Sequence, residues 1–418
     1  MEYHSDPQED SGSVPLGVSI VMPCLNEVQS LPHCIANARA ALAQIHDRFA
    51  LAGEIVIADN GSTDGSQALA EALGARVVHV SRKGYGAAII GGFDAAFGDY
   101  LVMGDCDGSY DFTDSVAMIG ALIDGADLCM GSRFLGGIAP GAMPWKNRYI
   151  GNPVLTGLLN LFFRTGINDA HCGLRAIRKE TYRALGLQGA GMEFASEMVI
   201  KAALRRHRIA QVPATLSPDL RDRAPHLRPW RDGWRHLRYL FMLSPTWAFG
   251  VPSVLMIGTG AIIFAIASLY ATGLLTGESP VGVSWTIAGA FAITTGHFAA
   301  VMALATHFYG ARQGYRPLRP FLQRYANVLT LENALIGGGA AVVASITSVA
   351  LVVYWWGSHG FVALPTTLPL LIAIVLGVAG MQTALGGFLI AVIGGHEAEF
   401  CPPNAVPDTA MQGRVPLR

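Results

Sequence analysis

The chain has 418 residues, of which 51% are hydrophobic and only 14% are charged, and its formal net charge is -1. A disordered chain would be poorer in apolar residues and a nucleic-acid-binding scaffold would be basic, so both classes are excluded. The charge is also unevenly spread, because residues 241–418 hold only six arginines, no lysine and five acidic residues. This asymmetry predicts a soluble domain followed by a membrane domain.

The first 15 residues are polar and rich in acidic residues, serine and proline, and we expect them to form a disordered N-terminus. They lack the basic start and the apolar core of a secretory signal. The six cysteines form no CxxC pair, so neither a disulfide framework nor a zinc site is predicted. We therefore expect the soluble half to stay in the cytoplasm, where thiols remain reduced.

Residues 16–225 alternate between short β-branched segments and helical patterns. The predicted strands are 18–22, 54–58, 76–80 and 100–103, and the predicted helices are 31–44, 65–73 and 86–97. This rhythm predicts an α/β domain with a parallel sheet that is covered by helices on both faces. Ligands of such sheets bind at the carboxyl ends of the strands, so the segments that follow the strands are the candidates for chemistry.

Polar motifs follow three of these strands. Residues 23–27 (Pro-Cys-Leu-Asn-Glu) follow the first strand and residues 59–65 (Asp-Asn-Gly-Ser-Thr-Asp-Gly) follow the second, where they could bind a nucleoside or simply form a turn and a helix cap. Asp105 and Asp107 follow the fourth strand. Two carboxylates one residue apart can face a divalent cation such as Mg²⁺ or Mn²⁺ on a diphosphate, and their place after an apolar strand favours this over a solvated turn.

Three further groups of residues have two interpretations each. The segment Lys83-Gly84-Tyr85-Gly86 opens a helix, where it could contact phosphate or form a structural turn. Arg133 and Arg175 follow short apolar runs and could bind phosphate or form surface ion pairs. Glu193 and Glu197 lie one helical turn apart, and Glu197 could be a general base or could position or cap the helix.

The segment 226–240 is predicted to be an amphipathic juxtamembrane helix at the lipid headgroups. Apolar residues recur at helical spacing, namely Leu227, Trp230, Trp234, Leu237 and Phe241. An adjacent basic stripe follows one residue later, namely Arg228, Arg231, Arg235 and Arg238. The helix could be a mere anchor, but Arg221 and Arg223 stand just upstream, where an anionic lipid headgroup would arrive. The apolar stretch 155–163 could dock on the membrane or belong to the domain core.

Four stretches without charge follow, at 241–275, 281–310, 333–357 and 361–395. Each is long enough to cross a bilayer core of ~30 Å, which needs about 20 residues of helix, so residues 241–395 are predicted to be a four-helix transmembrane domain. Four arginines lie between the second and third stretches, which places that loop, the first 240 residues and the tail 396–418 on the cytoplasmic side of the inner membrane. Frequent glycines indicate a compact bundle or a homo-oligomer. His297 and His307 could be proton carriers or structural.

Taken together, the motifs at 23–27, 59–65, 83–86, Asp105-x-Asp107, 131–133 and 172–175 resemble the inverting GT-A glycosyltransferases of family 2. They are most similar to the branch of the dolichyl-phosphate mannosyltransferases and polyprenyl-phosphate glycosyltransferases. The resemblance covers about residues 16–225. It implies a Rossmann-like mixed sheet of the nucleotide-diphospho-sugar transferase type in front of the four membrane helices.

The resemblance also implies roles for individual residues. Pro23, Leu25, Glu27 and Asp59 would bind the nucleoside of the donor, and Asp105 and Asp107 would bind the metal and the diphosphate. The start of the helix at 83–86 adds Lys83 and Gly84 to the expected donor-binding residues. Arg133 and Arg175 would contact donor or acceptor phosphates. From their own positions in the chain, Arg221 and Arg223 are expected to position the acceptor together with Arg175. Glu197 is added to Asp105, Asp107, Arg133 and Arg175 in the expected catalytic set.

Three positions depart from the family pattern. Leu25 stands where an aromatic residue is common, and Asn60 stands where a second aspartate is common, so the identity of the base stays open. Ser109 replaces the glutamine that usually follows the Asp-x-Asp motif, with Asp111 nearby, which leaves the third metal ligand open. All three changes leave the two carboxylates in place.

The predicted function is the metal-dependent, inverting transfer of one sugar from a UDP- or GDP-sugar to a polyprenyl phosphate (undecaprenyl or dolichyl) in the membrane, for a cell envelope glycan. One alternative is a glycosyltransferase that acts on a diacylglycerol- or ceramide-type hydroxyl. A second alternative is a non-catalytic membrane subunit that binds nucleotide-sugars or glycolipids.

Overall fold

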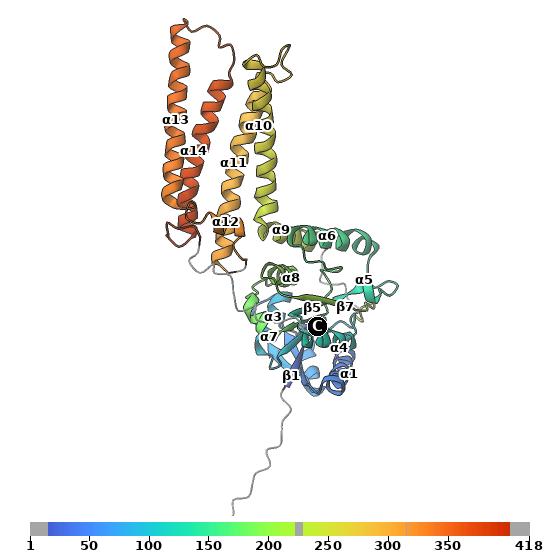
Figure 1. Ribbon diagram of the computed structural model, residues 1–418. Helices are drawn as coiled ribbons and strands as arrows, with labels where there is room; N and C mark the ends of the chain where they lie inside the picture. Colours follow the sequence, from blue (N-terminus) through green and yellow to red (C-terminus); the bar gives the residue numbers. More distant parts are fainter. Residues whose placement is uncertain (1–15, 222–228, 315, 402–418) are drawn as a thin grey trace, which may run out of the picture. The chain divides into compact units, whose positions relative to one another are not determined.

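Seven strands form one sheet in the first part of the chain, in a computed structural model that describes residues 16–221, 229–314 and 316–401 (Figure 1). The strands are β1 (Leu16–Cys24), β2 (Ala52–Asp59), β3 (Arg76–His79), β4 (Tyr100–Met103), β5 (Leu128–Ser132), β6 (Arg175–Arg178) and β7 (Ile209–Pro213). Their order is β3-β2-β1-β4-β6-β5-β7, and β6 runs antiparallel to both of its neighbours.

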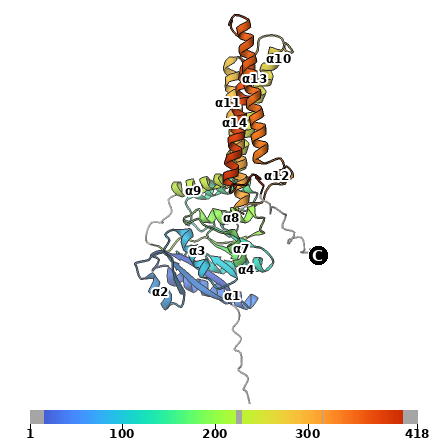
Figure 2. The ribbon, with the colours of Figure 1, turned by 90° about the vertical axis from the view of Figure 1, so that its left-hand side faces the viewer.

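Helices cover both faces of this sheet (Figures 1 and 2). The helices of this part of the chain are α1 (Leu31–Phe49), α2 (Ser66–Ala72), α3 (Tyr85–Ala95), α4 (Ser115–Ile123), α5 (Arg133–Gly136), α6 (Asn152–Phe163), α7 (Lys179–Leu185), α8 (Phe194–Leu204) and α9 (Pro229–Met242), with short turns η1 (Phe112–Asp114) and η2 (Asn147–Gly151). Helices α1, α2 and α4 share one hydrophobic core, and α3 and α8 lie on the other face.

The pattern of β1 explains this layering. Ile20 and Met22 are fully buried in the core under α1, and Val21 points the other way, against Gly92 of α3. A strand buried on both faces therefore appears in the sequence as a continuous apolar run. Helix α1 has a proline in its first turn and buries one stripe at helical spacing, consisting of Leu31, Cys34, Ile35, Ala38, Ala41 and Ile45.

The four strands predicted from the sequence are confirmed as β1 to β4. These four strands pair in parallel, as predicted, and β6, which is not among them, is reversed between β4 and β5. The reversal follows from the chain path, since residues 133–174 leave β5 and come back at the same edge of the sheet. The mixed sheet that the family resemblance implied is confirmed.

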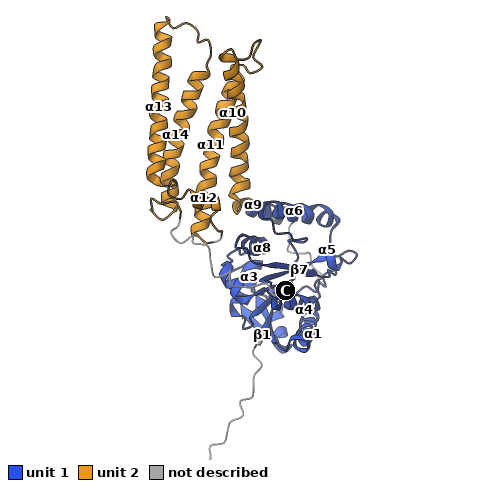
Figure 3. Cartoon of the chain, viewed as in Figure 1, with its two compact units in different colours: residues 1–240 blue, residues 241–418 orange. Residues whose placement is uncertain are grey.

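The chain consists of two compact units, residues 1–240 and residues 241–418 (Figure 3). In its described residues, 241–314 and 316–401, the second unit contains four helices long and apolar enough to span a membrane, which agrees with the predicted number of spans. The helices of this unit are α10 (Val251–Ala271, preceded by η3, Thr246–Gly250), α11 (Val283–Arg312), α12 (Pro320–Arg324), α13 (Leu331–Ser358) and α14 (Leu368–Ile393). The chain is therefore a multi-pass membrane protein.

Within the second unit, α10 pairs with α11, α13 pairs with α14, and α11 joins the two pairs through α14. A Cβ atom on Gly338 would lie 2.6 Å from the carbonyl oxygen of Gly380, so the α13–α14 contact needs glycine there. His297 of α11 bonds to two side chains of α14, with its Nδ1 2.9 Å from Gln382 Oε1 and its Nε2 3.3 Å from Thr383 Oγ1. These contacts link two membrane helices, and the proton-carrier interpretation of His297 stays a prediction.

Candidate active site

The polar motifs meet at the carboxyl-end edge of the sheet because β1 lies between β2 and β4. The backbone N–H of Asn60 donates to the carbonyl oxygen of Cys24 (2.9 Å), and Asn26 Oδ1 accepts from the N–H of Thr63 (2.8 Å). These bonds join the loops after β1 and β2. The joined loops and Arg221 enclose a pocket of about 390 Å³, lined by Asn26, Glu27, Val28, Gln29, Thr63, Asp64 and Arg221.

Asp59 is buried at the end of β2, and its carboxylate shapes the loop that follows. It accepts from the backbone N–H groups of Gly61 and Ser62 and from the side-chain amide of Gln67 (2.6 Å). Burial alone would raise the pKa of Asp59, but these hydrogen bonds outweigh it and lower the pKa. Asp59 is therefore ionised, and it organises the turn over residues 59–65 that was one of the two interpretations of this motif. The turn lies beside the predicted nucleoside pocket.

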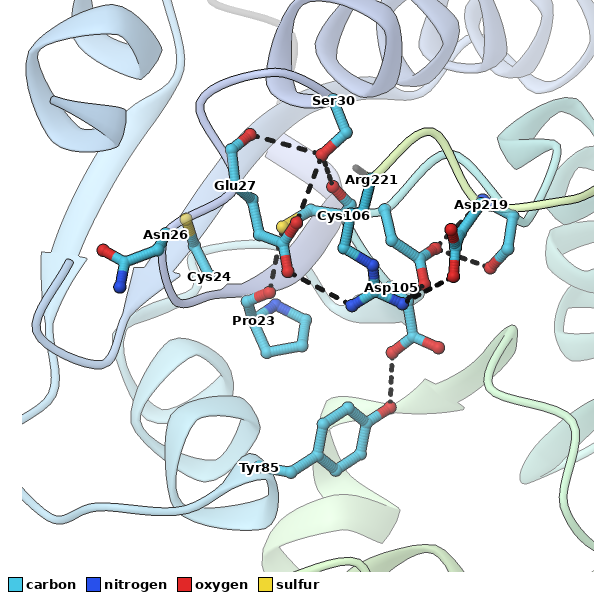
Figure 4. Close-up of polar contacts among 12 residues, drawn as sticks. Pro23, Cys24, Asn26, Glu27, Ser30, Tyr85, Asp105, Cys106, Asp219 and Arg221 are labelled. Atoms are coloured by element: carbon cyan, nitrogen blue, oxygen red, sulfur yellow. Dashed lines mark hydrogen bonds and ion pairs between the residues drawn. The ribbon is translucent and has the colours of Figure 1, made fainter. Parts of the chain in front are cut away.

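Asp105 and Asp107 follow β4, and Figure 4 shows Asp105 beside Tyr85, whose hydroxyl donates to Oδ1 at 2.9 Å. Burial, and then the nearby charge of Asp107, raise the pKa of Asp105 to about 6. Gly173 packs against the other oxygen, since a Cβ atom there would lie 2.9 Å from Asp105 Oδ2. Asp107 Oδ1 accepts from the N–H (2.9 Å) and the hydroxyl (2.6 Å) of Ser109.

Arg221 bridges the carboxylates of two motifs (Figure 4). Its guanidinium donates to Asp107 Oδ2 at 2.6 Å, to Asp219 Oδ2 at 3.2 Å and to Glu27 Oε1 at 3.3 Å. Burial would lower the pKa of Arg221, but the three acidic neighbours raise it, so the group stays cationic. The sequence placed Arg221 near an arriving lipid headgroup, and in the structure it lies in the carboxylate cluster itself. Arg223 falls outside the described residues.

The two carboxylates fit a divalent cation. Burial, and then repulsion by Asp107, raise the pKa of Asp105, and a bound cation would relieve that repulsion. Among residues 16–221, 229–314 and 316–401, no group of three or more His, Cys, Asp and Glu side chains could hold a metal ion. The protein would thus supply two oxygen ligands, and a diphosphate and water would complete a shell of the kind Mg²⁺ prefers.

Lys83 and Gly84 support the loop after β2. Lys83 Nζ donates to the carbonyl oxygen of Asn60 (2.5 Å), and the N–H of Gly84 donates to Asn60 Oδ1 (2.9 Å). Gly84 has φ of +130°, and a Cβ atom there would collide with the carbonyl oxygen of Ala190. The structural-turn interpretation therefore accounts for these contacts, and phosphate binding stays a prediction.

The two predicted phosphate-binding arginines are both buried, so the alternative of surface ion pairs is wrong. Arg133 forms a bidentate ion pair with Asp169, at 2.7 Å and 2.8 Å. Arg175 donates to three backbone carbonyl oxygens, those of Cys172 (2.8 Å), Ala170 (2.9 Å) and Ala195 (2.5 Å). Both guanidinium groups thus bind protein groups, and their predicted contact with a phosphate stays a prediction.

Glu197 is only 1% exposed on α8. It lies 2.7 Å from Lys201 Nζ and accepts from the backbone N–H groups of Gln188 (3.1 Å) and Gly189 (2.7 Å). The loop that it anchors is the one against which Gly84 packs. These contacts fit the positioning interpretation, and a general-base role stays a prediction.

Sequence reasoning missed Asp169 and Tyr110 as parts of the site. Asp169 lies 36 positions after its partner Arg133, so no local spacing reveals the pair. The hydroxyl of Tyr110 accepts from the N–H of Gly173 at 2.8 Å, which joins the loop before β6 to the Asp-x-Asp loop. Because β6 is antiparallel, its beginning lies at the edge where β4 ends, and a purely parallel sheet would not have placed it there.

The helices α6 and α9 lie at the same end of the first unit (Figure 1). The stretch 155–163 is part of α6, which buries Thr156 and Leu159 in the domain. The segment 145–161, which runs through η2 into α6, exposes apolar side chains, including Trp145, Tyr149, Ile150, Val154 and Leu161. Core packing and an exposed apolar face are therefore both present on this helix. Helix α9 covers 229–242, and residues 226–228 of the predicted juxtamembrane helix lie outside the described part.

Comparisons with known proteins agree with these observations. The family model described as Glycosyl transferase family 2 matches residues 19–186, and the model described as Glycosyltransferase family 2 C-terminal transmembrane region matches residues 304–394. The low-salt glycan biosynthesis hexosyltransferase Agl6 of Haloferax volcanii is 33% identical over 380 residues, which cover 90% of this chain and 89% of that protein.

Other relatives match the first unit. The polyprenol monophosphomannose synthase of Mycolicibacterium smegmatis is 30% identical over 215 residues, covering 47% of this chain and 76% of the relative. The dolichol-phosphate mannosyltransferase of Pyrococcus furiosus is 26% identical over 232 residues, which cover 54% of this chain and 63% of that protein. Among solved structures, glucosyl-3-phosphoglycerate synthase of Mycobacterium tuberculosis matches with a TM-score of 0.43 and 22% identity, covering 55% of this chain and 80% of that one.

Proposed function

The chain belongs to glycosyltransferase family 2, and we propose that it transfers a single sugar from a UDP- or GDP-sugar to a polyprenyl phosphate, with inversion at the anomeric carbon. The observation that carries this proposal is the cluster of Asp105, Asp107 and Arg221 at the carboxyl edge of the sheet, beside a pocket that Glu27 lines. Relatives named as polyprenol- and dolichol-phosphate mannose synthases support the choice of acceptor.

In this proposal the loops after β1 and β2 hold the nucleoside. Glu27 is buried, and its carboxylate accepts from Arg221 (3.3 Å) and from the hydroxyl of Ser30 (3.4 Å), so it has a fixed place at the pocket wall. Pro23 and Leu25 would border the base, and ionised Asp59 would keep the second loop in shape. Lys83 and Gly84 would support the diphosphate side of the pocket from the start of α3.

Asp105 and Asp107 would hold Mg²⁺ or Mn²⁺, which neutralises charge on the departing diphosphate when it is bound. Tyr85 fixes one oxygen of Asp105 and Ser109 fixes one oxygen of Asp107, so the carboxylates are held before the donor arrives. The acceptor phosphate is already an anion and needs no base to attack the anomeric carbon. Arg221, with Arg175 and Arg223, would guide that phosphate, and Arg133 would hold the segment around Asp169.

We further propose that the first unit and the tail lie in the cytoplasm, at the inner membrane. The arginine-rich loop between the second and third spans supports this orientation through the positive-inside rule. A membrane-bound acceptor then meets an enzyme that is itself confined to the same surface, which favours their encounter. The glycine-rich membrane helices would also permit a homo-oligomer.

The proposal is tested by incubating the purified protein with a panel of labelled nucleotide-sugars and undecaprenyl phosphate, with Mn²⁺ or with EDTA, followed by extraction into organic solvent. Label should enter the organic phase with Mn²⁺ and not with EDTA. Label that stays in the aqueous phase with every donor would contradict the proposal. Label that enters equally with EDTA would contradict the metal assignment alone.

The first alternative changes the acceptor to a diacylglycerol- or ceramide-type hydroxyl, which would need a general base. We expect Glu197→Gln to leave kcat with undecaprenyl phosphate within about threefold of wild type, because a phosphate acceptor needs no base. Its Tm should fall, because a side-chain amide cannot accept from both backbone N–H groups and Lys201. A base role predicts instead a loss of about 10²- to 10⁴-fold in kcat, with the same fall in Tm.

The second alternative is a non-catalytic subunit that binds nucleotide-sugars or glycolipids. It predicts donor binding without metal-dependent transfer or hydrolysis. The buried, preorganised carboxylate pair argues against it, because a binding module has no need for two carboxylates that repel each other.

We propose that the exposed apolar face of η2 and α6 contacts the lipid surface. Trp145 and Tyr149 are 62% and 67% exposed, and each has a cationic neighbour over its ring, Lys146 and Arg148. Aromatic rings flanked by cations are typical of helices that lie at anionic headgroups. The amphipathic helix predicted at 226–240 would lie at the same surface.

A bimane label at Val154→Cys should therefore be quenched by lipids that carry a nitroxide near the headgroup. The label should go into a Cys401→Ser background, because the other cysteines are buried. Phe97→Cys is the matched control, since Phe97 is an exposed apolar residue (65%) outside this face. Equal quenching at both positions, or none at Val154→Cys, would contradict membrane contact by α6.

A further inference from the structure

Three polar side chains that the proposed function does not use lie together where α9 packs on α8. They are His171, Ser196 and His236, and we call them the α9 joint. His236 is buried on α9, with its Nδ1 2.7 Å from Ser196 Oγ of α8. The ring of His236 also meets the ring of His171 edge to face, with centroids 4.9 Å apart and an interplanar angle of 86°. One side chain of α9 thus contacts both α8 and the segment before β6.

His171 contributes its ring and not a charge. Both of its ring nitrogens are buried and have no hydrogen-bond partner in the described part of the chain. Burial, and then the proximity of His236, lower the pKa of His171 to about 3, so the imidazole is neutral at physiological pH. Its partner in the joint is therefore the face or edge of the other ring, an interaction that a phenyl ring could also make.

The segment 169–173 connects the joint to the carboxylates. Gly173 packs against Asp105 Oδ2, and its N–H donates to the hydroxyl of Tyr110 at 2.8 Å. Arg175 binds the carbonyl oxygens of Ala170 and Cys172 and also that of Ala195 on α8. The backbone of the segment is therefore tied to α8 next to Ser196, and it lies between the α9 joint and Asp105.

We propose that His236 is a positioning residue that couples α9 to the segment 169–173 through Ser196 and His171. This inference rests on the proposed function, in which the acceptor is a lipid phosphate. When α9 lies among lipid headgroups, the joint holds the segment beside Asp105 in the arrangement that accepts a membrane-bound phosphate. Arg175 then acts in this coupling through its three carbonyl contacts.

The first test compares two acceptors in the full-length protein reconstituted in lipid nanodiscs. His236→Ala and Ser196→Ala should raise KM for undecaprenyl phosphate by about three- to tenfold, as expected for the loss of one buried hydrogen bond. KM for the donor, and turnover of a short, water-soluble prenyl phosphate, should stay within about twofold of wild type, because neither depends on α9 at the lipid surface. His46→Ala, an exposed histidine of α1, is the matched control.

His171 offers a second, sharper pair of variants. His171→Phe keeps a ring at the joint and should retain the wild-type KM for undecaprenyl phosphate. His171→Ala removes the ring and should raise that KM as His236→Ala does. Equal behaviour of the two His171 variants, or an equal change of KM for both acceptors, would overturn the coupling role.

A readout without turnover separates this inference from the proposed function. In Ser196→Ala and His236→Ala, backbone amides of residues 169–175 should exchange hydrogen faster than in wild type, and His46→Ala should not change them. Unchanged hydrogen exchange of residues 169–175 in these variants would overturn the coupling role of His236, even if the enzyme proves active on polyprenyl phosphate. Faster exchange in an enzyme that proves to use a different acceptor would support the coupling of α9 to the segment 169–173 and would reject the proposed function.

Discussion

Asp107→Asn should lower sugar transfer by roughly 10³-fold and leave a folded protein. The asparagine keeps the volume of the side chain, and its carbonyl oxygen can still accept from Ser109, so the loop after β4 should survive. What it loses is the negative charge that faces Arg221 at 2.6 Å and that would hold the divalent cation. Initial rates with labelled donor, with Tm measured on the same preparations, check the prediction.

Asp111→Asn is the matched control for this experiment. Asp111 follows the same motif, but it is exposed, and its Oδ1 accepts from Asn37 (2.9 Å) and from the hydroxyl of Thr113 (2.7 Å). The rate of sugar transfer by Asp111→Asn should stay within about twofold of wild type if Asp111 takes no part in holding the cation. A full loss of activity in Asp111→Asn would instead make it the third ligand that the sequence left open. Wild-type activity in Asp107→Asn would refute the metal assignment.

Asp169→Asn should destabilise the catalytic unit by roughly 3–5 kcal/mol, because it leaves the buried Arg133 without a counter-charge. For a unit of this size the loss corresponds to a Tm lower by roughly 6–20 °C. Burial would raise the pKa of Asp169, but Arg133 lowers it, so the stabilisation is present above the ordinary pKa of 3.8. The full effect should therefore appear in thermal unfolding at neutral pH, and it should fade only when pH falls below 3.8.

The double variant Arg133→Met, Asp169→Leu decides what Arg133 does. Replacing a buried ion pair by apolar side chains is often neutral or stabilising, so Tm should recover. If Arg133 only holds the segment around Asp169, activity should recover with Tm. If Arg133 contacts a phosphate, the protein should be stable and inactive. Failure of Tm to recover would contradict our account of the ion pair.

The strands β1 to β4 could be predicted because their signal is local, namely a short apolar run that ends in a polar motif. The same holds for the four membrane helices, whose length and lack of charge are sufficient evidence. Strand β6 could not be placed in this way. Its direction depends on where the 133–174 segment returns, and no spacing within β6 itself carries that information.

In the candidate site, too, the residues with a local sequence signal could be predicted and the others could not. Asp105, Asp107, Glu27 and Asp59 lie next to strands that the sequence reveals, and the structure brings them to one edge. The positions of Arg221 and Arg133 depend on partners 114 and 36 residues away, so the sequence suggested phosphate contacts where the structure has carboxylates. A motif indicates which residue types gather, and tertiary packing decides what each one contacts.

The reversed strand β6 also bears on how such enzymes diversify. The segment 133–174 departs from and returns to a single edge of the sheet, so it behaves as an insert with both ends fixed in one place. Arg133 and Asp169 pair with each other near its two ends, and the residues between them can vary in number and type without shifting the register of β4 or disturbing the loops after β1 and β2. Selection could therefore exchange this insert to suit new acceptors while the nucleotide half of the fold is inherited unchanged.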